Sequence, residues 1–138
     1  MKKLNCILLI DDDETTNYVN TILINKLGCT EQTKSVTSGM AALEYLKSAD
    51  EDQNHPQPQL IFLDINMPIM SGWEFIEEYN KLEPKQRGGV LIWMLSTSNN
   101  PEDHERALQL GSAGFMAKPL TLAKLTEVVN KHFPDLNR

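Results

Sequence analysis

Four groups of polar residues in this 138-residue sequence have the side-chain types that phosphoryl chemistry uses. They are Asp11 with Asp12 and Asp13, Asp64, Ser96 with Thr97, and Lys118 with Pro119. Carboxylates that lie close together repel one another, so they must take up protons or share a cation. Their hard oxygen atoms suit Mg²⁺, which commonly binds one or two carboxylates together with phosphate oxygens. A nearby lysine would supply a second positive charge for a phosphate group.

Asp64 has the chemistry of a covalent nucleophile, because an aspartate carboxylate can attack phosphorus and form an acyl phosphate. Phosphoryl transfer needs mainly positioning and the neutralisation of charge. An ion held by Asp11, Asp12 and Asp64 would provide part of that neutralisation, and Lys118 and the hydroxyl of Ser96 would provide the rest. We therefore expect a Mg²⁺ site whose nucleophile is Asp64.

Each of the four groups follows directly after a short apolar run. The runs are Cys6–Ile10, Leu60–Leu63, Val90–Leu95 and Ala113–Ala117. Short apolar runs bounded by turn residues predict strands that are covered on both faces. Because the carboxyl ends of parallel strands meet at one edge of a sheet, the four groups would converge on a single crevice.

Helical patterns separate the apolar runs. We expect five helices: Glu14–Leu27 before Gly28, Gly39–Ala49 capped by Ser38, a stretch from Ser71 to Lys81, a helix from Pro101 that is capped by Asn100 and stopped by Gly111, and a last helix from Thr121 to before Pro134. A fifth strand must fall in the polar stretch Glu31–Val36, which suits the edge of a sheet. This alternation predicts an α/β fold, a doubly wound five-stranded parallel sheet with helices on both faces.

The length of the chain is typical of one domain. We expect a single domain over residues 1–138 with its core at about residues 3–133, and the polar stretch Asp50–Gln59 as a solvated loop within it. No apolar run approaches the roughly 18 residues that cross a bilayer. The apolar stretch after Met1–Lys3 is too short for the core of a signal peptide, so we expect no membrane insertion and a cytoplasmic location.

Charge and cysteine content exclude other classes of protein. The formal net charge of −6 argues against direct binding of nucleic acid, which needs a basic face. The two cysteines, Cys6 and Cys29, have neither the spacing of a zinc site nor that of a disulfide framework, and we expect both to be buried thiols. Trp73 and Trp93 are best interpreted as packing residues, and His55, His104 and His132 as surface residues without a role.

Taken together, the motifs resemble those of response-regulator receiver domains. The matching segments, in order, are Ile7–Asp13, Leu63–Pro68 with Gly72, Leu95–Ser98 and Lys118–Pro119. The resemblance extends from about Lys3 to Phe133, and the four motifs together are highly specific. It implies a stand-alone, CheY-like receiver of two-component signalling with a flavodoxin-like (βα)5 fold.

The resemblance also implies a role for individual residues. The metal-binding acidic pair falls on Asp11 and Asp12, the phosphoacceptor on Asp64, the metal-ligating backbone carbonyl on Asn66, the phosphate-contacting hydroxyl on Ser96, and the lysine of the site on Lys118. It further implies a cis peptide bond between Lys118 and Pro119, which an X-Pro bond permits at little cost. Asp13 is an extra acid that we expect to be peripheral.

A conformational switch is implied as well. The switch positions fall on Ser96, where threonine is more frequent, and on Phe115, which lacks the hydroxyl of the tyrosine often found there. Whether Phe115 acts as a switch or only as a core residue is left open by the sequence. Asn66 and Ser98 fall where side chains tune hydrolysis of the acyl phosphate in this family.

The implied function is phosphorelay. A phosphohistidine in a sensor histidine kinase or a histidine phosphotransfer protein would donate the phosphoryl group to Asp64. The receiver would catalyse only its own Mg²⁺-dependent phosphorylation and dephosphorylation, with no turnover of an external substrate. The surface of the last two helices would then change and bind a downstream protein, with the chain a monomer or a phosphorylation-dependent dimer.

Residues at the expected site also bear on other classes of function. A flavodoxin-like electron carrier needs a hydroxyl-rich phosphate cradle where this chain has Asp11–Asp13, and an aspartyl hydrolase would typically have a second acid where this chain has Asn66. Both are disfavoured. A degenerate receiver that acts as a constitutive protein-interaction module stays open as the alternative.

Overall fold

We describe a computed structural model of the chain, which covers residues 3–48, 58–87, 90–97 and 100–134. Three interpretations of the sequence lie outside these ranges: the loop over residues 50–57, the surface position of His55 and the tuning role of Ser98. Within the described ranges, no helix has the length and apolar character needed to cross a membrane.

Five parallel strands form one sheet in the order β2-β1-β3-β4-β5. Their bounds are β1 Leu4–Ile10, β2 Thr30–Val36, β3 Leu60–Asp64, β4 Leu91–Ser96 and β5 Gly114–Ala117. The doubly wound sheet expected from the sequence is confirmed, and the polar strand β2 lies at one edge of it. Strand β1 pairs with both β2 and β3, so chain order reverses direction at β1 and opens a crevice beyond its carboxyl end.

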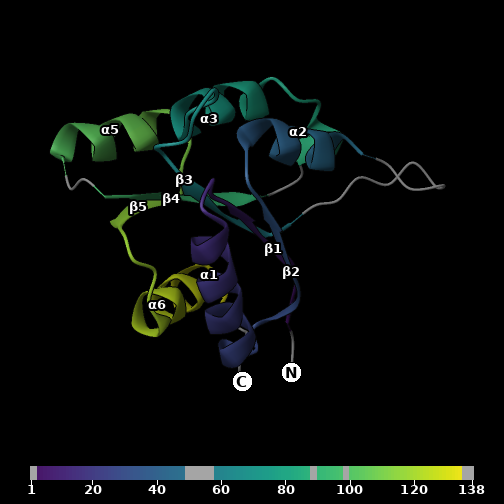
Figure 1. Cartoon of the computed structure of the whole chain (residues 1–138), viewed down its shortest axis with the longest axis vertical. Helices are drawn as coiled ribbons and strands as arrows, with labels where there is room; N and C mark the ends of the chain where they lie inside the picture. The colour runs from purple at the N-terminus through teal and green to yellow at the C-terminus, as the bar shows by residue number, and fades with distance from the viewer. Residues whose placement is uncertain (1–2, 49–57, 88–89, 98–99, 135–138) are drawn as a thin grey trace.

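Helices cover both faces of this sheet. Their bounds are α1 Glu14–Leu27, α2 Gly39–Lys47, α3 Gly72–Asn80, α4 Pro84–Arg87, α5 Pro101–Gln109 and α6 Leu122–His132. Figure 1 shows α2, α3 and α5 on one face and α1 and α6 on the other. The four-residue helix α4 is an addition to the five expected helices, because a single turn is too short to leave a periodic pattern in the sequence.

The helix ends agree with the predicted signals. The Ser71 side chain accepts a hydrogen bond from Glu74 N, and the Glu74 carboxylate accepts one from Ser71 N in return, which forms a capping box. Asn100 caps α5 ahead of Pro101. Helix α1 ends at Gly28, whose φ of 71° is left-handed and costs glycine little.

Two apolar layers fix the sheet in place. One layer packs strand residues such as Leu63 and Met94 against α2, α3 and α5, and the other packs Phe62 and Leu95 against α1 and α6. All five residues of β3 are buried. The carboxyl ends of the central strands are therefore held by packing on both sides, which gives the polar residues that follow them a rigid support.

Candidate functional site

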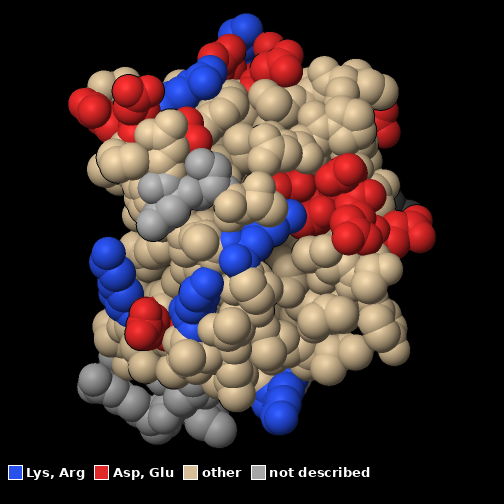
Figure 2. Space-filling model, turned by 60° about the vertical axis from the view of Figure 1, so that its left-hand side comes forward, with Lys and Arg blue, Asp and Glu red and all other residues tan. Residues whose placement is uncertain are grey.

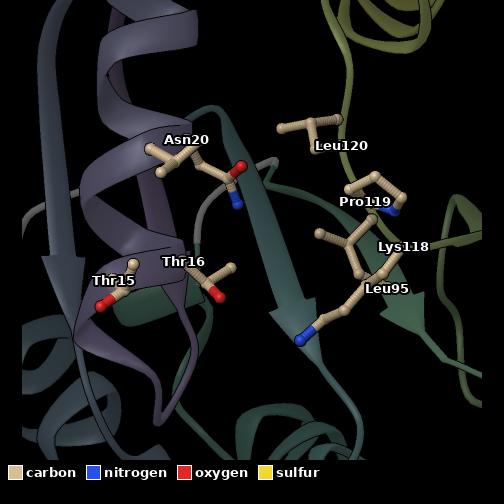
Figure 3. Close-up of a pocket in the computed structure, with 8 residues that line it drawn as sticks. Thr15, Thr16, Asn20, Leu95, Lys118, Pro119 and Leu120 are labelled. Carbon is tan, nitrogen blue, oxygen red and sulfur yellow. The ribbon is translucent and has the colours of Figure 1, made fainter.

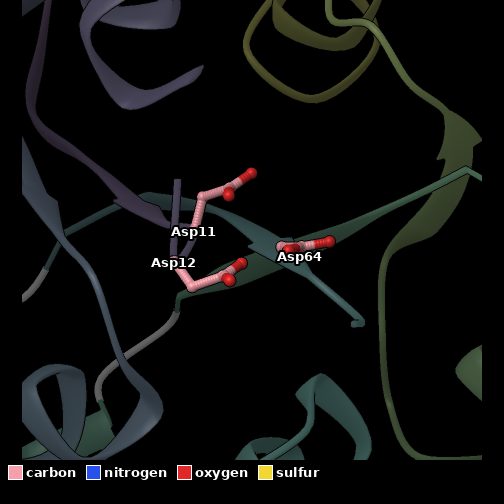
Figure 4. A group of neighbouring side chains, drawn as sticks. All are labelled: Asp11, Asp12 and Asp64. Carbon is pink, nitrogen blue, oxygen red and sulfur yellow. The ribbon is translucent and has the colours of Figure 1, made fainter. Parts of the chain in front are cut away.

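Three carboxylates converge at the carboxyl ends of β1 and β3. One oxygen from each of Asp11, Asp12 and Asp64 lies within 4.8 Å of the other two. Figure 4 shows Asp11 and Asp12 at the end of β1, beside Asp64 at the end of β3. Asp11 and Asp64 are each only 4% exposed, whereas Asp12 is exposed. The convergence expected from the sequence is therefore observed, and these residues form a cluster that could hold a metal ion.

Lys118 pairs with both buried carboxylates. Its Nζ lies 2.8 Å from Asp11 Oδ2 and 3.1 Å from Asp64 Oδ1. Burial alone would lower the pKa of Lys118, but the hydrogen bonds and charges of Asp11 and Asp64 outweigh it, and the pKa is raised. Lys118 therefore stays charged at the centre of the cluster. Figure 2 shows basic side chains bordering a dense group of acidic ones on this face of the molecule.

The position of Asp64 is fixed by the backbone that follows it. Asn66 N donates a hydrogen bond of 3.3 Å to Asp64 Oδ1, and Gly72 N donates one of 2.9 Å to the carbonyl of Ile65. A Cβ atom on Gly72 would lie 2.6 Å from the carbonyl oxygen of Asp64, so only glycine allows this close approach. Burial, followed by the negative charge of Asp11, raises the pKa of Asp64.

The position of Asp11 depends on the start of α1. Asp13 N donates a hydrogen bond of 2.9 Å to Asp11 Oδ1. Asn17 Nδ2 donates to the backbone carbonyls of Asp11, at 2.9 Å, and Val36, at 3.2 Å, and so ties the end of β1 to the end of β2. Asn17 was not identified from the sequence, although a buried asparagine on the inner face of a helix is a signal for such a tie.

Asp13 has a definite structural role at the edge of the site. Its side chain caps α1 by accepting hydrogen bonds of 3.0 Å from Thr15 N and Thr16 Oγ1. The hydrogen bonds from Thr16 and then Thr15 lower the pKa of Asp13. Asp13 thus orients the helix that begins beside the carboxylates, which its interpretation as a peripheral acid missed.

Ser96 and Lys118 lie side by side at the ends of β4 and β5. Ser96 is 2% exposed, and its carbonyl accepts a hydrogen bond of 2.7 Å from Lys118 N. The peptide bond between Lys118 and Pro119 is cis, as the resemblance implied. Lys124 Nζ donates to the carbonyls of Ala117, at 2.7 Å, and Pro119, at 3.1 Å, and so holds the segment on both sides of Lys118.

Phe115 is buried, with 8% of its surface exposed, and it packs among the apolar side chains of the α2, α3 and α5 layer. The imidazole of His104 lies against it, with 4.2 Å between ring centroids. On the other face, Trp93 Nε1 donates a hydrogen bond of 3.0 Å to His132 Nε2. His104 and His132, which we expected at the surface without a role, are both half-buried against aromatic partners.

A pocket of about 210 Å³ lies between α1 and the segment after β5. It is lined by Thr15, Thr16, Val19, Asn20, Leu95, Lys118, Pro119 and Leu120. Figure 3 shows side chains from the two sides facing one another across this gap, with Lys118 at one end. The pocket thus opens beside the lysine that pairs with the carboxylates.

Comparison with known proteins gives a consistent result. The family model of the response regulator receiver domain matches residues 7–130. The ethylene receptor 2 of Oryza sativa subsp. japonica is 34% identical over 122 residues, which are 86% of this chain but only 14% of the receptor. The response regulator Rcp1 of Synechocystis sp. is 27% identical over 123 residues, which are 89% of this chain and 82% of Rcp1.

Solved structures have the same fold. A two-component response regulator from Cytophaga hutchinsonii superposes with a TM-score of 0.83 at 34% identity, covering 94% of this chain and 97% of that one. The chemotaxis protein CheY4 of Vibrio cholerae superposes with a TM-score of 0.76 at 23% identity, covering 93% and 98% of the two chains. The second likeness concerns the fold alone.

Proposed function

Because the chain belongs to the response regulator receiver domain family, we propose that Asp64 is the residue on which it accepts a phosphoryl group. The chain is a receiver of two-component phosphorelay, a class that generally has no external substrate to turn over. One observation carries the assignment of Asp64: its buried carboxylate lies beside Asp11 and Asp12 and contacts the ammonium group of Lys118. A nucleophile, a set of metal ligands and a fixed positive charge thus meet at one point.

Mg²⁺ fits this donor set, because the three carboxylates supply hard oxygen ligands and Asp12 keeps the cluster open to solvent. Asp11, Asp12 and Asp64 would hold the ion, with the backbone carbonyl of Asn66 as a further ligand. When bound, the ion would neutralise charge on the oxygens of the phosphoryl group.

The chain's own residues would carry out the transfer as follows. The known contacts of Asp64 with Lys118 and Asn66 are made by Oδ1, so we assign Oδ2 as the attacking oxygen. A bond forms between Oδ2 and phosphorus while the bond between phosphorus and the donor's histidine nitrogen breaks, and the imidazole leaves with that electron pair. Lys118 would move its ammonium group toward the new phosphoryl oxygens, and the Ser96 hydroxyl would donate to one of them.

The proposed partners follow from this chemistry. A sensor histidine kinase or a histidine phosphotransfer protein would be the donor, and a downstream protein would bind the altered surface. Movement of Ser96 toward the phosphoryl group would release space for Phe115 and change the surface around α5 and α6. We place this activity in the cytoplasm, with residues 1–138 as a single domain and the chain a monomer or a phosphorylation-dependent dimer.

Intact mass measurement after incubation with acetyl phosphate and Mg²⁺ tests the proposal directly. We expect one phosphate adduct on the unmodified chain and none on Asp64→Asn or in the presence of a chelator. An adduct that persists on Asp64→Asn would refute the assignment of Asp64.

The alternative is a degenerate receiver that acts as a constitutive interaction module. It would bind Mg²⁺, as measured by a rise in Tm, yet give no adduct under the same conditions. The occupation of every chemical position of the site by a competent side chain favours the phosphoryl acceptor over this alternative.

A further inference from the structure

Ile69 occupies an unfavourable backbone conformation on the rim of the site. Its φ is 69°, and it is the only residue other than glycine with a positive φ among residues 3–48, 58–87, 90–97 and 100–134. Met70 N donates a hydrogen bond of 2.7 Å to the carbonyl of Pro68, which closes a γ-turn centred on Ile69. A β-branched residue is strained at positive φ, where glycine or asparagine would be tolerated.

The side chain of Ile69 is also unfavourably placed with respect to water. It is 97% exposed, the highest value among the exposed large hydrophobic residues of the described chain. Two costs, backbone strain and full exposure of an apolar group, therefore fall on one residue. Strained residues in functional regions commonly persist because their position serves the function.

The turn around Ile69 is fixed by contacts with the core and with the end of β3. Met67, two residues before Ile69, is buried in the core, and Met70, directly after it, is partly buried against the same core cluster. Gly72 N and Met67 N both donate to the carbonyl of Ile65, which ties the turn to the end of β3. The backbone that carries the isoleucine is thus fixed before binding, so a partner would lose little backbone conformational entropy in binding it.

The location of the turn narrows the choice of partner. Ile69 follows Asp64 by only five residues and lies in the segment that leaves the carboxyl end of β3. A macromolecule whose reactive group reaches Asp64 must approach this same edge of the sheet. Exposed carboxylates of Asp12, Asp13 and Glu74 border the approach, so a complementary surface would combine an apolar socket with basic side chains.

We propose that Ile69 is a preformed anchor that seats in an apolar socket of the histidine-bearing protein that phosphorylates this chain. The inference rests on the proposed phosphorylation of Asp64 and adds the contact by which the donor protein is recognised. Burial of an isoleucine side chain contributes a factor of about ten to a hundred in affinity. A small-molecule donor makes no such contact, so the two kinds of donor should respond differently to a change at this position.

The test compares Ile69→Asn with Leu108→Asn, which removes an exposed leucine from the surface of α5. Both variants and the unmodified chain are phosphorylated by acetyl phosphate and, separately, by the cytoplasmic region of a histidine kinase. This kinase is first autophosphorylated with ATP, and it is selected because it phosphorylates the unmodified chain. For Ile69→Asn we expect kcat/KM of transfer from the kinase to fall about ten- to hundredfold with an unchanged rate from acetyl phosphate. Its Tm should rise by about 3 °C, because asparagine relieves the strain at positive φ.

Each other result counts against the anchor. Equal transfer from the kinase to Ile69→Asn and to the unmodified chain would overturn it, as would an equal loss in Leu108→Asn. A loss with both donors would place Ile69 inside the chemistry rather than in docking, and would also overturn it. Failure of the unmodified chain to accept phosphate from acetyl phosphate would instead refute the proposed function, independently of Ile69.

Discussion

The two segments that flank the site, one leading from β3 into α3 and the other containing α5, are anchored to the core to very different degrees. Helix α3 buries Gly72, Phe75, Ile76 and Tyr79. Helix α5 has the same length of nine residues but buries only Ala107. The β3–α3 segment, which carries the nucleophile and Ile69, is therefore firmly packed against the core. Helix α5, on the opposite side of the site, buries much less and is held weakly.

This difference suits two different tasks. A nucleophile must keep its geometry while its environment gains and loses charge, which requires a rigid support. A helix that transmits a signal must instead move at a small cost in free energy, and such elements belong to the less stable parts of a fold. The His104–Phe115 ring contact is one interaction between α5 and the sheet, and it involves the proposed switch residue.

The largest effect is expected from Gly72→Ala, which tests whether the β3–α3 segment is rigid. The added Cβ would lie 2.6 Å from the carbonyl oxygen of Asp64 and 2.9 Å from Ile65 Cα, and neither backbone atom can turn aside. We expect the free energy of unfolding to fall by about 2–3 kcal/mol and the rate of phosphorylation by acetyl phosphate to fall with it. Urea denaturation and intact mass measure the two quantities.

Gly111→Ala is the matched control for Gly72→Ala. Gly111 has a φ of 91°, but a Cβ there meets no atom within 4 Å. Alanine should therefore cost about 1 kcal/mol of backbone strain without slowing phosphorylation. A Gly72→Ala variant that matched this control in both measurements would show that the β3–α3 segment yields easily, contrary to the comparison.

An intermediate effect is expected from Lys118→Met, because Lys118 reaches from the strand beside α5 to the fixed carboxylates. Its loss leaves Asp11 and Asp64 without a counter-charge, and because the Lys118 side chain is itself 20% exposed we expect a loss of about 1–2 kcal/mol of stability near neutral pH in the presence of a chelator. Exposed Lys81, which pairs with Glu78, provides the control Lys81→Met, with an expected change below about 0.5 kcal/mol.

The pH dependence of Lys118→Met has a definite sign. Burial and then the charge of Asp11 already raise the pKa of Asp64, and removal of Lys118 raises it further. When a carboxyl group has a higher pKa in the folded than in the unfolded state, the folded protein loses stability as pH rises. The loss occurs between the unfolded pKa, about 3.9, and the folded pKa. The variant should therefore be closest to the unmodified chain at about pH 4. Urea denaturation measures the difference in free energy of unfolding between Lys118→Met and the unmodified chain. An equal difference at pH 4 and pH 7.5 would contradict the ion pairs of Lys118 with Asp11 and Asp64.

Much of the β3–α3 segment was predictable from the sequence, because its strand and its helix start depend on local sequence patterns. Apolar runs ending in Asp11 and Asp64 predicted strands whose ends meet, and Ser71 predicted the start of α3. The rest depends on contacts between distant segments. The double pairing of Lys118 and the contact of His104 with Phe115 arise only when β5 has been placed in the sheet.

The conformation of Ile69 was unpredictable for the opposite reason. Isoleucine has no propensity for positive φ, so the local sequence argues against the turn that is observed. The packing of Met67 and Met70 and the hydrogen bonds to Ile65 override that local preference. Disagreement between local preference and the observed backbone is typical of functional or strained sites.

The smallest effect is expected from His104→Ala, which tests how weakly α5 is held against the sheet. Loss of a ring contact at 4.2 Å should cost about 1 kcal/mol and speed amide hydrogen exchange throughout α5, because few other buried groups hold this helix. His132→Ala is the control: it removes a half-buried imidazole that accepts a hydrogen bond from Trp93 on the opposite face, at a comparable cost. If exchange in α5 is equally fast in both variants, or unchanged in His104→Ala, the light anchoring of α5 does not depend on His104.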